Sequence, residues 1–513
     1  MHIFLSKFRE VLIDTFSADV RSLVLLRVCA AVVLLADLAI RATDLTAHYS
    51  DTGVLPRIAH YELGYYEYIS LHLLSGSPYV MGFLFLAAAT FAVLMGIGYR
   101  TRLFTILSWV MLVSLQNRNP MILQGGDDLL RMVLFWAMFI PWGNHFSVDS
   151  LITDRKPNSY RVFSPGVVAL MIQVGILYLS TFIQKSGPEW RSEFTAVYYA
   201  LNVDQMALAP ALWFRQYPLL MKLSTMLVIS LEGLTPLLLF FPIKTAWVRI
   251  VTVPLLIGMH ITFGLFLKIG LFPYIDALAL LIFLPSLFWK QIENVIFKIT
   301  YPPLSASVLK LPAKPAFLYA QSVVVGLLLC GVLFWNVTTI NQEVRGNALF
   351  DTFMTTFRLD QNWGMFSPYP FRDDGWYVIP ASDRRGNRFD LIKASTAAKV
   401  DWVKPQQPSL LFKNYRWRKY FRNIYYVENE RHRLYLGKCL CLNWNADRPY
   451  EDQLTSFKMY YVREETPTDV SQPLIHENLL LWTHHCFDEE KESTPQPAEA
   501  DQPELIVRRN ELE

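Results

Sequence analysis

Long apolar runs dominate this chain and decide what it can fold into. Nine of them approach the length at which a helix crosses about 30 Å of hydrocarbon, although the third and fourth are short. The runs cover residues 22–41, 79–98, 103–116, 128–142, 166–184, 219–241, 249–267, 270–288 and 317–340. Since 53% of the residues are hydrophobic, lipid rather than water is the solvent for most of the chain. The sequence therefore predicts an all-α polytopic membrane bundle of eight or nine transmembrane helices.

Basic residues gather in every second loop between these runs. They are Arg100, Arg102, Arg155, Lys156, Arg161, Lys244, Arg249, Lys290, Lys298, Lys310 and Lys314. Because short loops rich in Lys and Arg stay in the cytoplasm, we expect the N-terminus inside. Residues 41–78, residues 185–218 and everything after the last run are then expected outside. The net charge of +3 arises from these loops and gives no indication of a nucleic-acid partner.

The composition changes after residue 340, which divides the chain into four predicted segments. They are a cytoplasmic segment at 1–20, a transmembrane domain at 21–340, a small β-rich extracytoplasmic domain at 341–487 and a disordered acidic tail at 488–513. Strand-like stretches in the third segment are residues 375–380, 388–392, 425–427, 433–441 and 456–462, and Arg385-Gly386-Asn387 has the composition of a turn.

The five cysteines are too few and too scattered to predict a disulfide scaffold. Cys439 and Cys441 are separated by one residue, a spacing that by itself specifies neither a metal site nor a redox site. We therefore predict no metal.

Lys185 ends the fifth apolar run and is followed by Gly187, Pro188 and Trp190. A basic side chain at membrane depth is either an anchor or a reagent. As an anchor, Lys185 would reach for water at the outer interface with Trp190 as its aromatic neighbour. As a reagent, it would be withdrawn from water, where an amine more easily takes the neutral form that a general base needs. The residues alone leave both interpretations open.

Two further ionisable residues lie inside apolar runs. His260 either faces a cavity or is a neutral imidazole bonded to a backbone carbonyl of the next helix. Glu232 is the natural counter-group for a buried cation, and Arg118, Arg131 and Lys185 are its candidate partners.

The segment NRNPMILQGGDDLLR predicts a polar pocket at the outer end of the bundle. Asn117, Asn119 and Asp127 would line it, and the Gly125-Gly126 pair would let the backbone approach another group closely. Alternatively, this is a solvated loop in which Asp127 or Asp128 caps the following helix. Nearby, Asp37 and Arg41 are four residues apart, and we expect them to form a structural ion pair.

Several strings together resemble the HTTM domain, which is shared by the vitamin K-dependent gamma-carboxylase and its bacterial relatives. They are RVCAAVVLLADLAIRATDLTAHYSDTGVLPR, NRNPMILQGGDDLLR, YLSTFIQKSGPEW with TAVYYAL, the stretch from Glu232 through His260 to Pro285, and QNWGMFSPYP. The resemblance covers roughly residues 15–380. It implies a multi-pass protein of the bacterial inner membrane.

The resemblance also implies a chemistry. In the family's carboxylase a lysine amine deprotonates reduced vitamin K, and Lys185 occupies that place, with His260 lining the reaction chamber. The implied cofactor is a reduced quinone, either vitamin K or a menaquinol-like molecule, and a protein or peptide outside the cytoplasm would be the substrate. Asp127 stands where the carboxylase has a histidine, which argues against vitamin K itself.

Two functional classes therefore stay open. One is a quinol-dependent carboxylase, epoxidase or oxidase, a lyase or oxidoreductase that uses Lys185 and His260 for catalysis. In this class Asn117, Asn119, Asp127, Trp190 and Glu232 would bind substrate or cofactor. The other is a non-catalytic membrane factor, similar to lipase maturation factors, that binds lipid or assists export of a partner.

Overall fold

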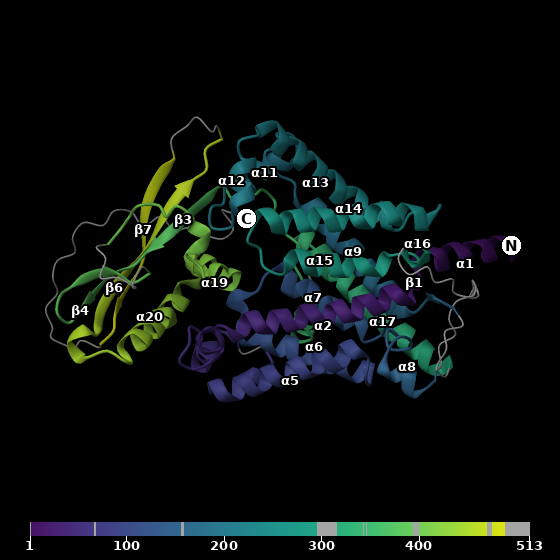
Figure 1. Ribbon diagram of the computed structural model, residues 1–513, viewed down its shortest axis with the longest axis horizontal. Helices are drawn as coiled ribbons and strands as arrows, with labels where there is room; N and C mark the ends of the chain where they lie inside the picture. Colours follow the sequence, from purple (N-terminus) through teal and green to yellow (C-terminus); the bar gives the residue numbers. More distant parts are fainter. Residues whose placement is uncertain are drawn as a thin grey trace.

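Each apolar run of the sequence forms a helix in the computed structural model, which describes residues 2–65, 68–154, 159–294, 315–341, 343–344, 346–392, 400–468 and 474–487. The bundle (Figure 1) contains α2 (Val20–Ala42), α5 (Pro78–Ile97), α6 (Thr101–Arg118), α7 (Gly125–Ala137), α9 (Pro165–Gln184), α13 (Pro218–Leu239), α14 (Thr245–Phe266), α15 (Phe272–Leu280) and α17 (Pro315–Ile340). Shorter elements join them: α1 (His2–Phe16), α3 (Leu45–Tyr49), α4 (Arg57–Glu62), α8 (Val148–Ile152), α10 (Pro188–Arg191), α11 (Ala196–Leu201), α12 (Ala209–Phe214), α16 (Ser286–Ile292), and the strands β1 (Ala18–Asp19) and β2 (Arg161–Val162).

Six of the described helices are long and apolar enough to cross a membrane, or seven if the pair bent by 100° at residues 272–292 counts as one span. α7 has only 13 residues, which reach about 20 Å at 1.5 Å per residue. It is buried along almost its whole length and forms the centre of the bundle. The predicted count of eight or nine crossings is therefore not confirmed.

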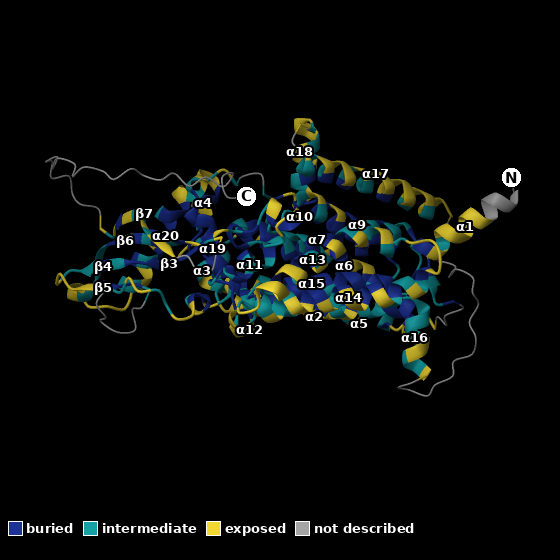
Figure 2. Ribbon diagram, turned by 90° about the horizontal axis from the view of Figure 1, so that it is seen from above, coloured by how far each residue is buried: buried dark blue, intermediate teal, exposed yellow. Residues whose placement is uncertain are grey.

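The outer helices present apolar side chains to their surroundings. In the most apolar window of α17 only 17% of the residues are buried, and in that of α5 only 22%. Figure 2 shows exposed residues along the outside of α17. Leu327 and Leu86, for example, are 69% and 67% exposed. Such surfaces are stable only against hydrocarbon, which supports an integral membrane protein.

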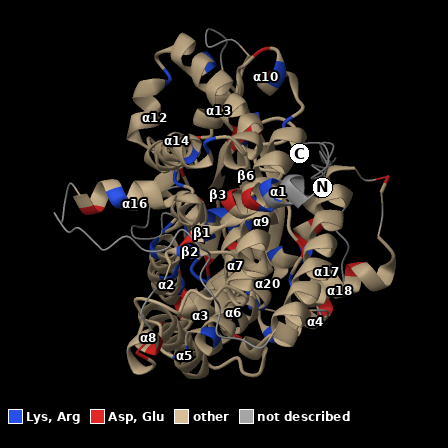
Figure 3. Cartoon of the chain, turned by 90° about the vertical axis from the view of Figure 1, so that its right-hand side faces the viewer, with Lys and Arg blue, Asp and Glu red and all other residues tan. Residues whose placement is uncertain are grey.

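The basic loops that we predicted on one side do meet at one end of the bundle (Figures 1 and 3). β1 pairs antiparallel with β2. The Arg249 guanidinium donates a 2.5 Å hydrogen bond to the carbonyl of Thr15, and Arg21 lies 2.6 Å from Glu293 on the segment after α16. The Arg100 backbone N–H donates to Asp149 of α8 at 2.7 Å. Residues 155–158 and 295–314, which carry other basic residues, lie outside the described residues.

The C-terminal domain lies at the opposite end and is mixed α+β. Its elements are β3 (Asp373–Val378), β4 (Pro380–Asp383), β5 (Arg388–Asp390), α19 (Tyr415–Tyr425), α20 (Glu430–Asn445), β6 (Leu454–Glu465) and β7 (Ile475–His485). The preceding helix, α18 (Ala348–Thr356), lies against α17 of the bundle, with Phe350 beside Phe334 (Figure 2). β6 pairs with β7 along one edge and with β3 and β4 along the other, and β5 closes the sheet beyond β4. All these pairings are antiparallel.

Two strand predictions in this domain are wrong. Residues 433–441 belong to α20, and residues 425–427 form the end of α19 and the start of the next turn. The alternation of Leu434, Leu436 and Leu440 has the period of a strand. His432, Tyr435, Leu436 and Cys439, however, are all buried, and their spacing of three and four residues is that of a helix. The turn at residues 385–387 is confirmed, with Gly386 at φ +80°.

A disulfide joins Cys441 of α20 to Cys486 beyond β7, which the scattered cysteines did not predict. It links α20 to the end of β7, an edge strand of the sheet. Cys29, Cys330 and Cys439 are free. The predicted tail at 488–513 lies outside the described residues.

The disulfide fixes the number of free thiols that a labelling experiment should find. Protein denatured without reductant is expected to react with three equivalents of a maleimide polymer, and reduced protein with five. Gel shift after expression in the native membrane measures both. Five equivalents without reductant would place these cysteines in a reducing compartment.

Candidate functional site

Lys185 lies where α9 ends. The helix begins at Pro165 behind its Ser164 cap, and its last intrahelical bond runs from the Lys185 N–H to Thr181 O at 3.2 Å. Lys185 has left the helical conformation (φ −74°, ψ 68°), and Arg191 donates back to its carbonyl at 2.8 Å. A cation at a helix C-terminus is favoured by the exposed carbonyls there.

The amine of Lys185 points into the protein rather than toward water. Its Nζ lies 2.5 and 2.7 Å from the two carboxylate oxygens of Glu232 on α13. It also lies 4.5 Å from the ring centroid of Trp190. Lys185, Glu232 and Trp190 are all at most 5% exposed. Of the three candidate partners of Glu232, the structure selects Lys185.

Residues 361–368 cover this pair from outside. Trp190 Nε1 donates to Phe366 O at 2.8 Å, and the Gly187 N–H donates to Pro368 O at 2.9 Å. A Cβ at position 187 would meet the same carbonyl at 2.8 Å, so only glycine fits there. The QNWGMFSPYP string therefore closes the end of the bundle over Lys185.

His260 of α14 does not bond a backbone carbonyl of the next helix. Its Nε2 lies 2.9 Å from the hydroxyl of Tyr178 and 3.4 Å from Asp276 Oδ1. Tyr178 comes from α9, two turns before Lys185, and Asp276 from α15. We call Tyr178, His260 and Asp276 the inner triad.

Asn117 and Asn119 hold the backbone of the segment between α2 and α5. Asn117 Nδ2 donates to Ile69 O at 2.8 Å, and Asn119 Nδ2 donates to His48 O at 3.1 Å. The Asn119 carbonyl oxygen also caps the turn that follows, accepting from Met121 N at 3.2 Å. These contacts fix the loop between α6 and α7.

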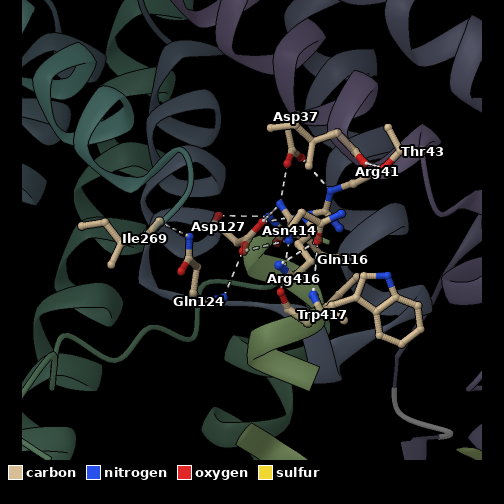
Figure 4. Close-up of polar contacts among 12 residues, drawn as sticks. Asp37, Arg41, Thr43, Gln116, Gln124, Asp127, Ile269, Asn414, Arg416 and Trp417 are labelled. Carbon is tan, nitrogen blue, oxygen red and sulfur yellow. Dashed lines mark hydrogen bonds and ion pairs between the residues drawn. The ribbon is translucent and has the colours of Figure 1, made fainter. Parts of the chain in front are cut away.

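Asp127 belongs to a buried cluster of four charges (Figure 4), which we call the charge cluster. Arg41 donates to Asp127 at 2.6 Å and to Asp37 at 2.7 Å. Arg416 of α19 reaches in from the C-terminal domain, lying 3.0 Å from Asp127 and also bonding Asp37. All four residues are at most 4% exposed. The expected Asp37–Arg41 pair is therefore half of an interdomain connection.

The same carboxylate also starts α7. Gln124 is the N-cap residue, and its N–H donates to Asp127 Oδ2 at 2.9 Å in a capping box. A Cβ on Gly126 would lie 3.2 Å from the Cα of Phe272, so this glycine allows α7 to pack closely on α15. Both carboxylate oxygens of Asp127 are thus engaged in structural contacts.

The residues expected to bind substrate or cofactor do not form one site in the structure. Within the described ranges, no hydrogen bond or ion pair connects Asn117, Asn119 or Asp127 to Lys185 or Glu232. Two groups contain side chains that can exchange protons: the Lys185–Glu232 pair beside Trp190, and the inner triad. Within the part of the chain that the structure describes, no group of three or more His, Cys, Asp or Glu side chains could hold a metal ion.

Sequence reasoning missed three residues of these clusters. Asp276 carried a usable signal, because it is a lone acid within an apolar run, as Glu232 is. Tyr178 precedes Lys185 by seven positions and so lies on the same helix face, which also could have been noticed. Arg416 carried none, since 379 residues separate it from Asp37.

We expect Asp374 of β3 to make the stability of the domain interface depend on pH. Burial raises the pKa of its carboxyl to about 7. The hydrogen bond from Gln205 N, at 3.0 Å, acts in the opposite direction and only partly offsets this rise. A folded state that holds this proton loses stability as the pH rises from about 4 through 7, by roughly 4 kcal/mol. Asp374→Asn is expected to remove that slope and to be more stable than the parent at pH 8. Thermal unfolding in detergent from pH 5 to pH 8 measures it, with the exposed Asp447→Asn as control.

A model of the HTTM domain family matches residues 17–288, more than half of the chain. The chain belongs to the HTTM domain family. The match holds Lys185, Trp190, Glu232, the inner triad and three members of the charge cluster. It stops before α17 and before the covering residues 361–368, so the resemblance that the sequence suggested up to about residue 380 is confirmed only in part. No curated protein and no solved structure matches the chain.

Proposed function

We propose that this HTTM protein is a membrane enzyme related to the vitamin K-dependent gamma-carboxylase, in which Lys185 accepts a proton from a quinol. The buried Lys185–Glu232 pair is the observation that carries the proposal. Desolvation of an ion pair at membrane depth costs free energy, which good geometry has to offset unless the pair is kept for its function. Here it lies at the end of the bundle, beside an aromatic ring.

Glu232 can make the amine available as a base. Transfer of one proton across the 2.5 Å contact leaves a neutral amine and a neutral carboxyl, which a site of low dielectric favours over two charges. Lys185 can then take a hydroxyl proton from a bound quinol, whose acidic hydroxyl and reducing ring supply the redox chemistry. The Trp190 ring, 4.5 Å from the Lys185 amine, is the aromatic group beside which the quinol ring would lie.

A second candidate is a non-catalytic factor that binds lipid or assists export. The same pair favours it, because both carboxylate oxygens of Glu232 are satisfied by Lys185 and the contact clamps α9 to α13. In this candidate the pair is a tie between helices, and quinol chemistry is absent.

Native mass spectrometry of gently extracted protein, combined with oxygen uptake, separates the two. The enzyme proposal expects a co-purifying quinone and oxygen consumption that depends on added quinol. A clean absence of both supports the binding factor. Gly187→Ala places a methyl group against the carbonyl of Pro368 and is expected to push residues 361–368 away from Lys185. This variant should therefore bind the quinol more weakly.

We further propose that the C-terminal domain faces the extracytoplasmic space of a bacterial inner membrane, where a protein or peptide substrate would reach it. The basic loops at the opposite end support this orientation, and so does the Cys441–Cys486 disulfide.

A further inference from the structure

The inner triad is a polar cluster made by three helices inside the bundle. The Tyr178 hydroxyl donates to Asp276 Oδ1 at 3.0 Å, and His260 Nε2 lies 2.9 Å from that hydroxyl. Tyr178, His260 and Asp276 are 1%, 4% and 0% exposed. The rings of Phe263 and Phe272 lie 5.6 and 5.8 Å from the His260 ring and help to exclude water.

Two buried polar atoms of the inner triad are not used in hydrogen bonds among the described residues. Among the described residues, His260 Nδ1 and Asp276 Oδ2 have no hydrogen-bond partner. An unpaired polar atom in an apolar interior costs about 1–3 kcal/mol, so a purely structural tie would be expected to satisfy both. A hydroxyl, an imidazole and a carboxyl can each give and take a proton. The cluster is therefore suited to proton exchange rather than to tying the helices together.

The triad is also placed next to the Lys185–Glu232 pair. Tyr178 and Lys185 lie on one face of α9, about 10 Å apart along the helix axis. α13 packs against both α9 and α14, and α14 packs against α15, so the helices that carry the groups are neighbours. One or two water molecules can span such a gap.

We propose that the inner triad is a second proton station, which takes up the proton that the Lys185–Glu232 pair gains from the substrate. This inference rests on the proposed function. The neutral carboxyl of Glu232 gives its proton to the oxygen of Tyr178 and then takes the proton from Lys185. The original hydroxyl proton of Tyr178 moves at the same time to Asp276 or His260. One proton enters and one leaves Tyr178, no electrons move, and Lys185 is neutral for the next turnover.

Tyr178→Phe tests the station because it removes the shuttling oxygen and keeps the ring. Purified protein in nanodiscs is mixed with a short-chain menaquinol and oxygen in a stopped-flow instrument. The first turnover is expected to keep its rate, while the steady-state rate falls at least tenfold and added imidazole restores part of it. Ser180→Ala, a buried hydroxyl on the same helix, is the control. Equal loss in both phases without rescue would show a structural role and overturn the proposal.

A measurement without turnover separates this inference from the proposed function. Infrared spectra of ¹³C-aspartate-labelled protein are recorded across pH, and the Asp276 band is assigned by its loss in Asp276→Asn. If the two clusters exchange protons, Glu232→Gln shifts the titration midpoint of this band by at least half a pH unit. No shift overturns the proposal even if quinol oxidation is observed. A shift without quinol oxidation sinks the proposed function and leaves the coupling standing.

Discussion

Arg416→Met is expected to lower the free energy of unfolding by about 3–5 kcal/mol, the cost of leaving one charge of a buried group unpaired. Arg416 and Arg41 balance Asp37 and Asp127, so the charge cluster is neutral as it stands. Removal of Arg416 leaves one net negative charge in a site that water does not reach. The C-terminal domain should then separate from the bundle before the bundle itself unfolds.

Thermal unfolding and limited proteolysis in detergent measure this effect. The double variant Arg416→Met with Asp127→Asn restores neutrality, and it should recover a large part of the loss. Arg388→Met on β5 is the matched control, because Arg388 is exposed in the same domain. If Arg416→Met and Arg388→Met are equally stable, the charge cluster does not hold the domains together.

Glu232→Ala is expected to have an effect of similar size. It leaves the amine of Lys185, 4% exposed, without its carboxylate, and only the Trp190 ring remains beside it. The estimated cost is again about 3–5 kcal/mol. Lys185→Met combined with Glu232→Gln removes both charges and should lie within about 1–2 kcal/mol of the parent.

Unfolding of the parent, Lys185→Met, Glu232→Gln and the double variant in one detergent gives the interaction energy of the pair. Glu193→Ala, an exposed acid close to the same helix end, is the control. A double variant no more stable than the Glu232→Ala single variant would mean that the two charges act independently, which their 2.5 Å contact does not allow.

The membrane bundle could be predicted from the sequence because apolar runs leave a chain few alternatives to helices. Lys185 and Glu232 could be chosen one by one, because ionisable residues in apolar runs are rare. Their pairing could not be deduced, since it depends on how α9 rotates against α13. The same limit applies to the inner triad, which three helices assemble from residues that are ordinary when taken singly.

The C-terminal domain was harder to predict. Leu434, Leu436 and Leu440 alternate as in a strand, yet α20 forms because Leu436 and Cys439 pack with the buried face of the sheet while Tyr435 packs against Leu55 and Ala59. Arg416 has no signal in its own segment, because its partners lie on α2 and α7. Residues that join two domains are fixed by tertiary contacts, and these are the positions where local patterns carry the least information.

The central claim is that Lys185 is the base, and the rate of quinol oxidation tests it most directly. General-base groups contribute about 10²–10⁴-fold in rate. Lys185→Met, and its more stable double variant with Glu232→Gln, are therefore predicted to oxidise a short-chain menaquinol at least 100-fold more slowly than the parent. Lys222→Met, an exposed lysine on α13, should keep the parental rate. Folded Lys185→Met protein that oxidises the quinol at the parental rate would contradict the account.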